Sequence, residues 1–309
     1  MEPFSVLMSI YKNENPKFLR ESLDSILNNT AYPDEIVMVK DGPLTPELET
    51  VLQKYQERTG LFHFVIHQKN QGLGLALRDG LVECKNELVA RMDTDDICCT
   101  KRFEKQIEFF ENHPMVSVVG SYVDEFLKDP RYPYSKAIFP TDDEAIRKFA
   151  KRRNPLKHPT VMFRKSAVIK SGNYRHFLWF EDYDLCIRML LSGFRMANIP
   201  EILLHYRADS NLYTRRGGLS YLKQDLNFQK FMLNRGFINR REYIMNCIGR
   251  SFVRLMPNKL RTFVYCTFLR SSIKHRTYDG GVRKYEPFIN LNILDFVQFY
   301  YYSFPLMEA

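Results

Sequence analysis

Three aspartates crowd into the sequence Arg91-Met92-Asp93-Thr94-Asp95-Asp96-Ile97, directly after the apolar run Leu88-Val89-Ala90. The apolar run predicts the end of a buried strand. Three carboxylates within four residues repel one another strongly unless a cation lies among them. Hard oxygen ligands suit Mg²⁺ or Mn²⁺, and such ions commonly also bind a substrate diphosphate. The alternative is a solvated acidic turn, or a helix N-cap formed by Asp95 and Asp96.

Strands and helices alternate on both sides of this turn. The apolar patterns predict strands at 4–10, 35–39, 62–67, 88–92 and 116–123, and helices at 17–27, 45–59, 73–82 and 101–112. A series of this kind builds an α/β fold in which helices cover both faces of an open, mostly parallel, Rossmann-like sheet. Further strands are expected at 160–163 and 203–207, with a helix at 142–151.

Three polar clusters fall where predicted strands end: Ser9 to Asn13, Lys40-Asp41-Gly42, and Asp93 to Asp96. Ligands of parallel α/β sheets bind beyond the carboxyl ends of the strands. We expect the first two clusters to face a base and a ribose, and the third to bind a metal ion and a diphosphate. The glycine-rich Asn70-Gln71-Gly72-Leu73-Gly74 lacks a P-loop lysine, so it is either a turn into a helix or a backbone contact to a nucleotide.

A second acidic pair lies among aromatic residues in Trp179-Phe180-Glu181-Asp182-Tyr183-Asp184-Leu185. Aromatic neighbours lower the local dielectric and raise the proton affinity of a carboxylate, as a general base requires. The alternative is that Glu181 and Asp182 only cap the helix that follows.

Positive charge is concentrated near the C-terminus. Residues 215–284 contain sixteen Lys or Arg and three acids, a net charge of +13, so the rest of the chain nets −4. From Leu219 onward the pattern predicts basic helices in which Arg250 and Arg254 alternate with aromatic and aliphatic residues. Such helices bind anionic membranes, or else pack on the main domain with their charges in solvent. A nucleic-acid partner is not favoured, because no reader motif is present.

These features divide the chain into residues 1–214 and residues 215–309. The N-terminus has no basic n-region, no apolar run is long enough to span a bilayer, and no CxxC pair suggests zinc. We therefore expect a cytoplasmic protein with reduced thiols that associates peripherally with the inner face of the cytoplasmic membrane.

Five motifs follow one another along the chain: Ser5-Val6-Leu7-Met8-Ser9-Ile10-Tyr11, Val39-Lys40-Asp41-Gly42, Asn70-Gln71-Gly72-Leu73, Arg91-Met92-Asp93-Thr94-Asp95-Asp96, and Glu181-Asp182. In this order they resemble the family 2 glycosyltransferases, which have the GT-A fold and invert the anomeric carbon. Arg215-Arg216-Gly217-Gly218 and the basic tail resemble the bacterial branch of β-1,3-glucosyl- and galactosyltransferases that extend GlcNAc-diphospho-undecaprenol in O-antigen or capsule assembly.

The resemblance implies a role for each matching residue. Asp93, Asp95 and Asp96 would bind Mn²⁺ or Mg²⁺ together with the donor diphosphate. Asp41 would hold the uracil or ribose of a UDP-sugar. Asp182 would be the catalytic base, with Glu181 beside it orienting the acceptor or the base. The processive synthases' QxxRW motif is absent, which favours the addition of one sugar per encounter.

Other donor contacts are expected from Ser9 and Tyr11, which belong to the first polar cluster. Arg207, Arg215 and Arg216 are candidates to bind the phosphates from a closing loop. The predicted partners are a UDP-sugar carrying glucose or galactose and a lipid-diphosphate-linked GlcNAc or GalNAc acceptor. Two alternatives are a DxD phosphohydrolase and a non-enzymatic basic membrane protein. The first would need its motif after the first strand, and the second leaves both acidic clusters unexplained.

Overall fold

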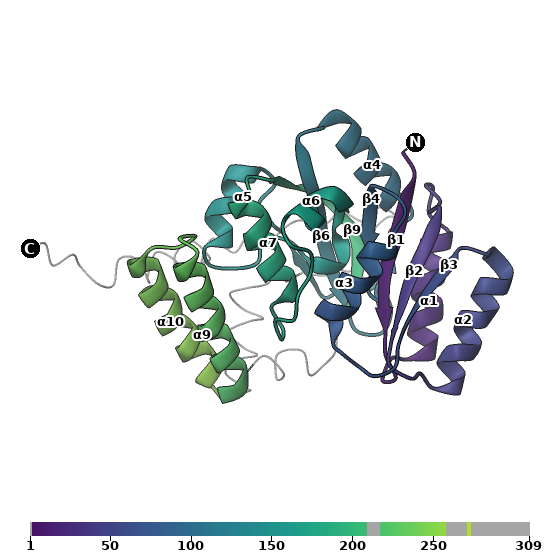
Figure 1. Ribbon diagram of the computed structural model, residues 1–309, viewed down its shortest axis with the longest axis horizontal. Coiled ribbons are helices and arrows are strands. Elements are labelled where there is room, and N and C mark those ends of the chain that lie inside the picture. The colour runs from purple at the N-terminus through teal and green to yellow at the C-terminus, as the bar shows by residue number, and fades with distance from the viewer. Residues whose placement is uncertain (1, 209–216, 258–270, 273–309) are drawn as a thin grey trace, which may run out of the picture.

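The N-terminal half of the sheet is parallel and ordered β3-β2-β1-β4. The computed structural model describes residues 2–208, 217–257 and 271–272. The four strands are β1 (Phe4–Ile10), β2 (Glu35–Asp41), β3 (Phe62–His67) and β4 (Leu88–Arg91), and they are connected by α1 (Pro16–Leu27), α2 (Pro46–Thr59) and α3 (Leu73–Glu83). The alternation read from the sequence is confirmed in this half, and all four strands end at one edge (Figure 1).

The other half of the sheet is mixed. It contains β5 (Ile97–Cys98), β6 (Val116–Phe126), β7 (Ser135–Ala137), β8 (Met162–Arg164), β9 (Arg195–Arg207) and β10 (Ser271–Ser272). Strand β8 runs antiparallel between β4 and β6, and β9 pairs parallel with β6 and antiparallel with β5. The α/β class is confirmed, but the direction of these later strands was not predictable, because apolar patterning does not encode strand direction.

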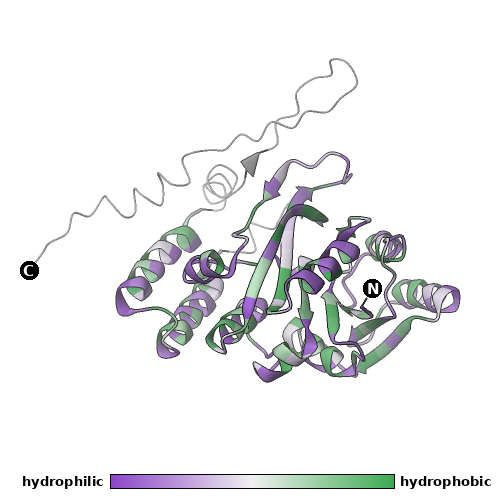
Figure 2. Cartoon of the chain, turned by 90° about the horizontal axis from the view of Figure 1, so that it is seen from above, coloured by the Kyte–Doolittle hydropathy of each residue, from purple (hydrophilic) through white to green (hydrophobic). Residues whose placement is uncertain are grey.

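Helices cover both faces of the sheet, as predicted. Alternate residues of a strand point to opposite faces, so Val6 packs with α1, α2 and α4 (Arg102–Asn112), whereas Leu7 packs with the second layer. The second layer contains α3, α5 (Asp143–Ala150), α6 (Lys165–Lys170), α7 (Glu181–Leu191) and α9 (Leu219–Asn234). Figure 2 shows hydrophobic residues along the central strands between these layers.

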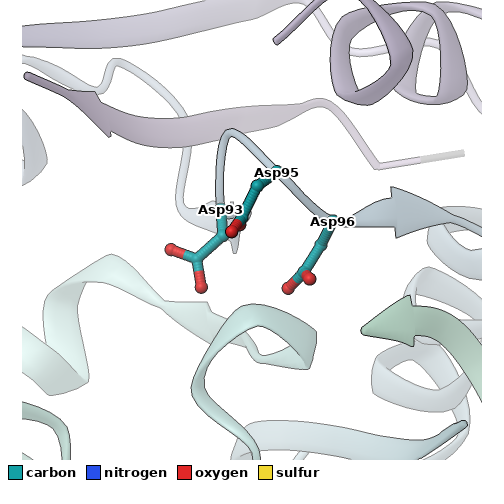
Figure 3. Close-up of side chains that lie close together, drawn as sticks. All are labelled: Asp93, Asp95 and Asp96. Atoms are coloured by element: carbon teal, nitrogen blue, oxygen red, sulfur yellow. The ribbon is translucent and has the colours of Figure 1, made fainter. Parts of the chain in front are cut away.

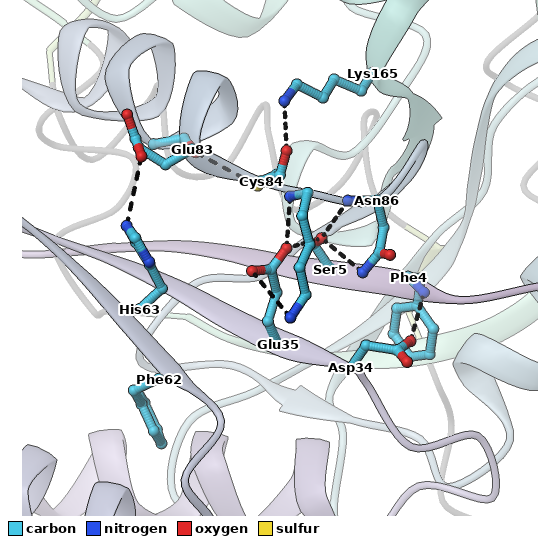
Figure 4. A network of polar contacts seen from close by, with 12 residues as sticks. Phe4, Ser5, Asp34, Glu35, Phe62, His63, Glu83, Cys84, Asn86 and Lys165 are labelled. Atoms are coloured by element: carbon cyan, nitrogen blue, oxygen red, sulfur yellow. Dashed lines mark hydrogen bonds and ion pairs between the residues drawn. The ribbon is translucent and has the colours of Figure 1, made fainter.

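A polar network ties together the amino-terminal ends of the parallel strands (Figure 4). The Ser5 hydroxyl donates to Glu35 Oε1 at 2.5 Å and accepts from the Asn86 backbone N–H at 3.3 Å. Lys165 Nζ donates to the carbonyl of Val82 at 2.8 Å. Hydrogen-bonded polar groups at this end fix the strands relative to one another, and the acidic clusters lie at the opposite, carboxyl-terminal end.

The described part of the C-terminal region is a helical hairpin that packs on α7. The Phe228 ring of α9 lies 5.1 Å from the ring of Phe180 and 4.6 Å from that of Tyr183. Helix α10 (Arg240–Leu255) then packs against α9 (Figure 1). None of the helices in the described ranges is long and apolar enough to cross a bilayer. Helix α9 contributes to the same apolar layer as α7. The division of the chain at residue 214 stays a prediction.

Candidate active site

Asp93, Asp95 and Asp96 form one carboxylate cluster in the turn between β4 and β5. One oxygen from each carboxylate lies within 4.8 Å of the others, and the three side chains point to the same side of the turn (Figure 3). The helix-cap alternative for this turn is wrong. Helix α4 begins at Arg102, its N-cap is Lys101, and no side chain caps it. The aspartates are therefore free to converge on a common ligand.

Hydrogen bonds to two backbone carbonyls and to the Asp96 carboxylate fix the conformation of this turn. The Arg207 guanidinium donates through Nε to the Asp95 carbonyl at 2.8 Å and forms an ion pair with Glu21. The Arg207 backbone N–H donates to Asp96 Oδ1 at 2.8 Å, and the Ser22 hydroxyl donates to the Asp93 carbonyl at 2.9 Å. Arg207, predicted as a phosphate ligand, thus supports the acidic turn. Arg215 and Arg216 lie outside the described residues.

The electrostatics of the cluster fit a divalent cation. Burial, followed by the charge of Asp93, raises the pKa of Asp95 to about 6. Burial and the charges of the other two aspartates raise the pKa of Asp96 well above its usual range. Within the described residues, the buried Asp96 Oδ2 has no hydrogen-bond partner. Buried carboxylate oxygens without donors are costly unless a cation binds them, and oxygen-only ligands are those that Mg²⁺ and Mn²⁺ prefer.

Glu14 is a fourth carboxylate at this cluster, and the sequence pattern does not predict it. Burial and then the charges of Asp95 and Asp93 raise its pKa to about 7, while a hydrogen bond with Thr94 opposes the rise. The Glu14 backbone N–H donates to the Tyr11 carbonyl at 3.1 Å. This turn folds the segment after β1 back toward the acidic turn. No spacing rule reveals the contact, because the path of a loop decides it.

A pocket of about 480 Å³ opens beside the ends of β1 and β2. The residues that line it are Tyr11, Lys12, Asn13, Asp41, Gly42, Pro43, Gln68, Lys69 and Asn70. Two of the predicted nucleotide-binding residues, Tyr11 and Asp41, thus meet at one pocket. Ser9 is partly buried in β1, one residue before the strand ends, and is not among the lining residues.

The buried carboxylate of Asp41 organises the turn into α3. It accepts from the backbone N–H groups of Gln71 at 2.8 Å and Gly72 at 2.9 Å, and it contacts His67 Nδ1 at 3.0 Å. Gly72 has a φ of 90°, which favours glycine. The glycine-rich stretch is therefore a turn whose amides bind Asp41. Contact of Asp41 with a nucleotide stays a prediction.

Glu181 and Asp182 occupy the first turn of α7 but do not cap it. The N-cap is Phe180, and no side chain makes a capping hydrogen bond. Asp182 Oδ1 accepts from the Tyr183 backbone N–H at 2.7 Å, and Oδ2 accepts from Asn154 Nδ2 at 2.8 Å. Burial, followed by the charge of Asp182, raises the pKa of Glu181 to about 7. This pair can accept a proton near neutral pH.

Arg91 connects the two carboxylate clusters. Its guanidinium is buried and forms an ion pair with Asp93, and its Nε and Nη1 atoms have no hydrogen-bond partner in the part of the chain that the structure describes. The charge of Arg91 lowers the pKa of both Asp95 and Glu181, and Asp93 is among the charges that raise the pKa of Glu181. The two clusters therefore lie close enough to interact electrostatically. Nothing in the sequence pattern indicates this role of Arg91.

An aromatic residue and a histidine lie on the α7 side of Arg91. Tyr174 and His158 are hydrogen-bonded at 3.0 Å and line a small cavity together with Asn154 and Asp182. Burial, then the charge of Arg91, lowers the pKa of His158 well below its usual range, so the imidazole is neutral. His158 therefore faces Tyr174 as an uncharged ring, and it is not part of the carboxylate cluster of Asp93, Asp95 and Asp96.

The parallel half-sheet, a nucleotide-sized pocket, an aspartate cluster and a separate acid pair are together the arrangement of a GT-A glycosyltransferase. The family model described as "Glycosyl transferase family 2" matches residues 5–174. The chain belongs to this glycosyltransferase family.

Comparisons with other proteins agree. The chain is 40% identical over 265 residues to the amylovoran biosynthesis glycosyltransferase AmsE of Erwinia amylovora, covering 85% of this chain and 97% of that one. It is 36% identical over 267 residues to the UDP-Gal:alpha-D-GlcNAc-diphosphoundecaprenol beta-1,3-galactosyltransferase of Escherichia coli, covering 86% and 96%.

Solved structures show the same fold at low sequence identity. Residues 1–349 of S. aureus TarS in complex with UDP-GlcNAc superpose with a TM-score of 0.62 at 17% identity, covering 81% of this chain and 72% of that chain. The mannosyltransferase PcManGT from Pyrobaculum calidifontis, in complex with GDP-Man and Mn2+, superposes with a TM-score of 0.57 at 15% identity, covering 86% and 74%.

Proposed function

We propose that this glycosyltransferase moves glucose or galactose from a UDP-sugar to a hydroxyl of a GlcNAc or GalNAc that is linked to a lipid diphosphate. The reaction would belong to the assembly of an O-antigen or exopolysaccharide. The activity named for the E. coli relative and the amylovoran role named for the Erwinia relative support the acceptor and the pathway. The observation that carries the proposal is the interaction of two acidic clusters through Arg91.

The donor nucleotide would bind in the pocket beside Tyr11 and Asp41. Asp41 would act there by fixing the turn at Gln71 and Gly72, directly after the lining residue Asn70, and by presenting any remaining carboxylate lone pair to a ribose. The UDP-GlcNAc complex of the TarS neighbour supports a uridine donor.

Asp93, Asp95 and Asp96 would hold Mn²⁺ or Mg²⁺, and the Mn2+ complex of the PcManGT neighbour supports a divalent ion. A bound divalent ion would neutralise the negative charge that develops on the leaving diphosphate. Arg207 would keep the turn in shape through its contacts with Asp95 and Asp96. Arg215 and Arg216 stay candidates for direct phosphate contact.

Asp182 would take the proton from the acceptor hydroxyl. Asn154 and the Tyr183 N–H orient its carboxylate, so the base is positioned before the acceptor arrives. Glu181 would orient the acceptor or the base. Attack from the face opposite the leaving diphosphate gives inversion in a single displacement through an oxocarbenium-like transition state.

A panel assay tests this function. The purified full-length chain is incubated with UDP-glucose, UDP-galactose and other nucleotide sugars, together with a GlcNAc-diphosphate-alkyl acceptor and Mn²⁺ or Mg²⁺. We expect transfer of one hexose, with the β-anomer of the product visible by NMR. Absence of transfer from every UDP-sugar, or an α-linked product, would contradict the proposal.

We further propose that the enzyme works as a peripheral protein on the inner face of the cytoplasmic membrane, and that it has no nucleic-acid partner. Exposed cations gather on the C-terminal hairpin, and a lipid-diphosphate acceptor of the kind named for the E. coli relative resides in a membrane.

A further inference from the structure

Helix α10 exposes its apolar face. Five large apolar side chains are exposed along one stripe at helical spacing. They are Ile244 (54% exposed), Met245 (39%), Ile248 (56%), Phe252 (59%) and Leu255 (55%). A contiguous apolar surface of this kind marks an interaction site.

The polar face of α10 points inward. Arg250 and Arg254 both form ion pairs with Asp225 of α9, whose carboxylate is fully buried. Asn246 Nδ2 donates to the Lys151 carbonyl at 2.8 Å and to Gln229 Oε1 at 2.9 Å. The two arginines that the sequence assigned to a membrane surface are therefore used to attach α10 to the protein, and the apolar stripe is not needed for that attachment.

The charges around the stripe indicate what covers it. Between residues 217 and 257, every exposed charged side chain is basic: Lys223, Lys230, Arg235, Arg240 and Arg241. Asp225 is buried and paired, and Glu242 is paired with Lys151 at 2.8 Å. A second copy of this hairpin would bring cations against cations. A surface with an apolar interior and negative charge at its boundary complements the stripe, and an anionic bilayer has both properties.

The hairpin also contacts the segment that carries Glu181 and Asp182. The Trp179 ring, which is 44% exposed, stacks on Tyr221 of α9 at 4.9 Å with an interplanar angle of 18°. The Arg254 guanidinium of α10 also lies over the Tyr221 ring, 4.5 Å from its centre. Helix α10 is thus linked through the Tyr221 and Trp179 rings to the segment just before Glu181 and Asp182.

We propose that the exposed stripe of α10 inserts into the interface of an anionic phospholipid bilayer and docks the enzyme beside its lipid-linked acceptor. The docking itself stands on the helix geometry and the surrounding charge. Only the benefit for the acceptor rests on the proposed function. The apolar side chains enter the lipid, while Arg240, Arg241 and the exposed lysines of α9 contact lipid headgroups.

Vesicle sedimentation of the full chain tests the docking. The test variant is I248S/F252S, and the matched control I66S/V82S removes two equally exposed apolar side chains from β3 and α3. With vesicles of phosphatidylcholine and phosphatidylglycerol, we expect the vesicle affinity of the test variant to fall by about tenfold or more and that of the control to stay unchanged. Circular dichroism and thermal unfolding should match the unaltered chain, because all four sites are exposed.

Two further measurements separate the possible outcomes. Unaltered vesicle affinity in I248S/F252S, or equal binding to phosphatidylcholine alone, would overturn the inference. A dimer of the unaltered chain that dissociates in I248S/F252S, measured by light scattering, would also overturn it, because the stripe would then be covered by a second copy.

Transfer assays distinguish this inference from the proposed function. I248S/F252S should retain transfer to a water-soluble acceptor with a short alkyl chain. Its transfer rate on an acceptor embedded in anionic vesicles should fall by about fivefold or more. If the unaltered chain transfers no sugar to either acceptor, the proposed function fails while the vesicle-binding result still decides the docking.

Discussion

The two acidic clusters are built in opposite ways. In the turn after β4, Ser22 and Arg207 donate to two backbone carbonyls and to Asp96 Oδ1, the carboxylates converge, and Asp96 Oδ2 has no partner among the described residues. On α7, N–H donors bind both carboxylate oxygens of Asp182, and Glu181 has a pKa of about 7. The first arrangement accumulates negative charge, which suits the proposed divalent cation. The second arrangement fixes the Asp182 carboxylate and raises the pKa of Glu181 to near neutrality. Chemical roles therefore follow from how each acid is supported, since the residue types are alike.

Removing a ligand from the acidic turn should have the largest effect. In Asp95→Ala, one of the three converging carboxylates is gone, and stabilisation of the leaving diphosphate by the cation is lost. We expect transfer to fall by about 10⁴-fold or more. Calorimetric titration with Mn²⁺ should show a matching loss of binding, with unchanged circular dichroism. Full activity in this variant would remove the metal assignment.

Altering the α7 pair should impair the reaction and spare the metal. Asp182→Asn keeps the size of the side chain but cannot accept the acceptor proton, so we expect kcat to fall by about 10³-fold. Asn154→Ala leaves the Asp182 carboxylate in place but removes its orienting donor, together with the acceptor of the Leu156 backbone N–H, so a loss of about tenfold is expected. Mn²⁺ affinity should stay unchanged in both variants. Weaker Mn²⁺ binding in Asp182→Asn would show that the two clusters share one role.

The sequence predicted the acidic clusters better than their surroundings. The spacing of Asp93, Asp95 and Asp96 and the alternation of β1 to β4 are local properties, so both could be read directly. The cap alternative could be excluded only from the structure, because the helix boundaries at Arg102 and Glu181 vary by a residue or two in any pattern.

The site residues that the sequence pattern did not predict depend on contacts between distant segments. Glu14 reaches the acidic turn from the loop after β1, and Arg91 connects to α7 across the sheet edge. Arg207 was expected at a phosphate, yet it hydrogen-bonds the Asp95 carbonyl from β9. The inward orientation of Arg250 depends on Asp225, a residue 25 positions earlier. Periodicity shows which face of a helix is apolar but does not show whether that face is covered.

The pH profile should sharpen the contrast between the clusters. The pKa of Glu181 is about 7, so this acid gains a proton as the pH falls through neutrality. If the ionised pair is the active form, kcat/KM should fall below pH 7 by about tenfold per unit. In Glu181→Gln the limb near pH 7 should disappear, although the maximum rate is lower. A limb that persists near pH 7 in this variant would assign the titration to another group.

The same pKa makes a smaller prediction about stability. Glu181 has an ordinary value of 4.5 and a folded-state value of about 7, with burial as the largest cause. Between these values the folded protein binds more protons than the unfolded chain, so stability falls as the pH rises from 4.5 to 7. Glu181→Gln removes this penalty and should raise Tm by a few degrees at pH 8 and by little at pH 5. Asp182→Asn breaks the acceptor for Asn154 and should not raise Tm at either pH. Equal Tm changes at pH 5 and pH 8 in Glu181→Gln would show that the ionised Glu181 is not destabilising, and the contrast between a neutralised turn and a proton-exchanging pair would lose its energetic basis.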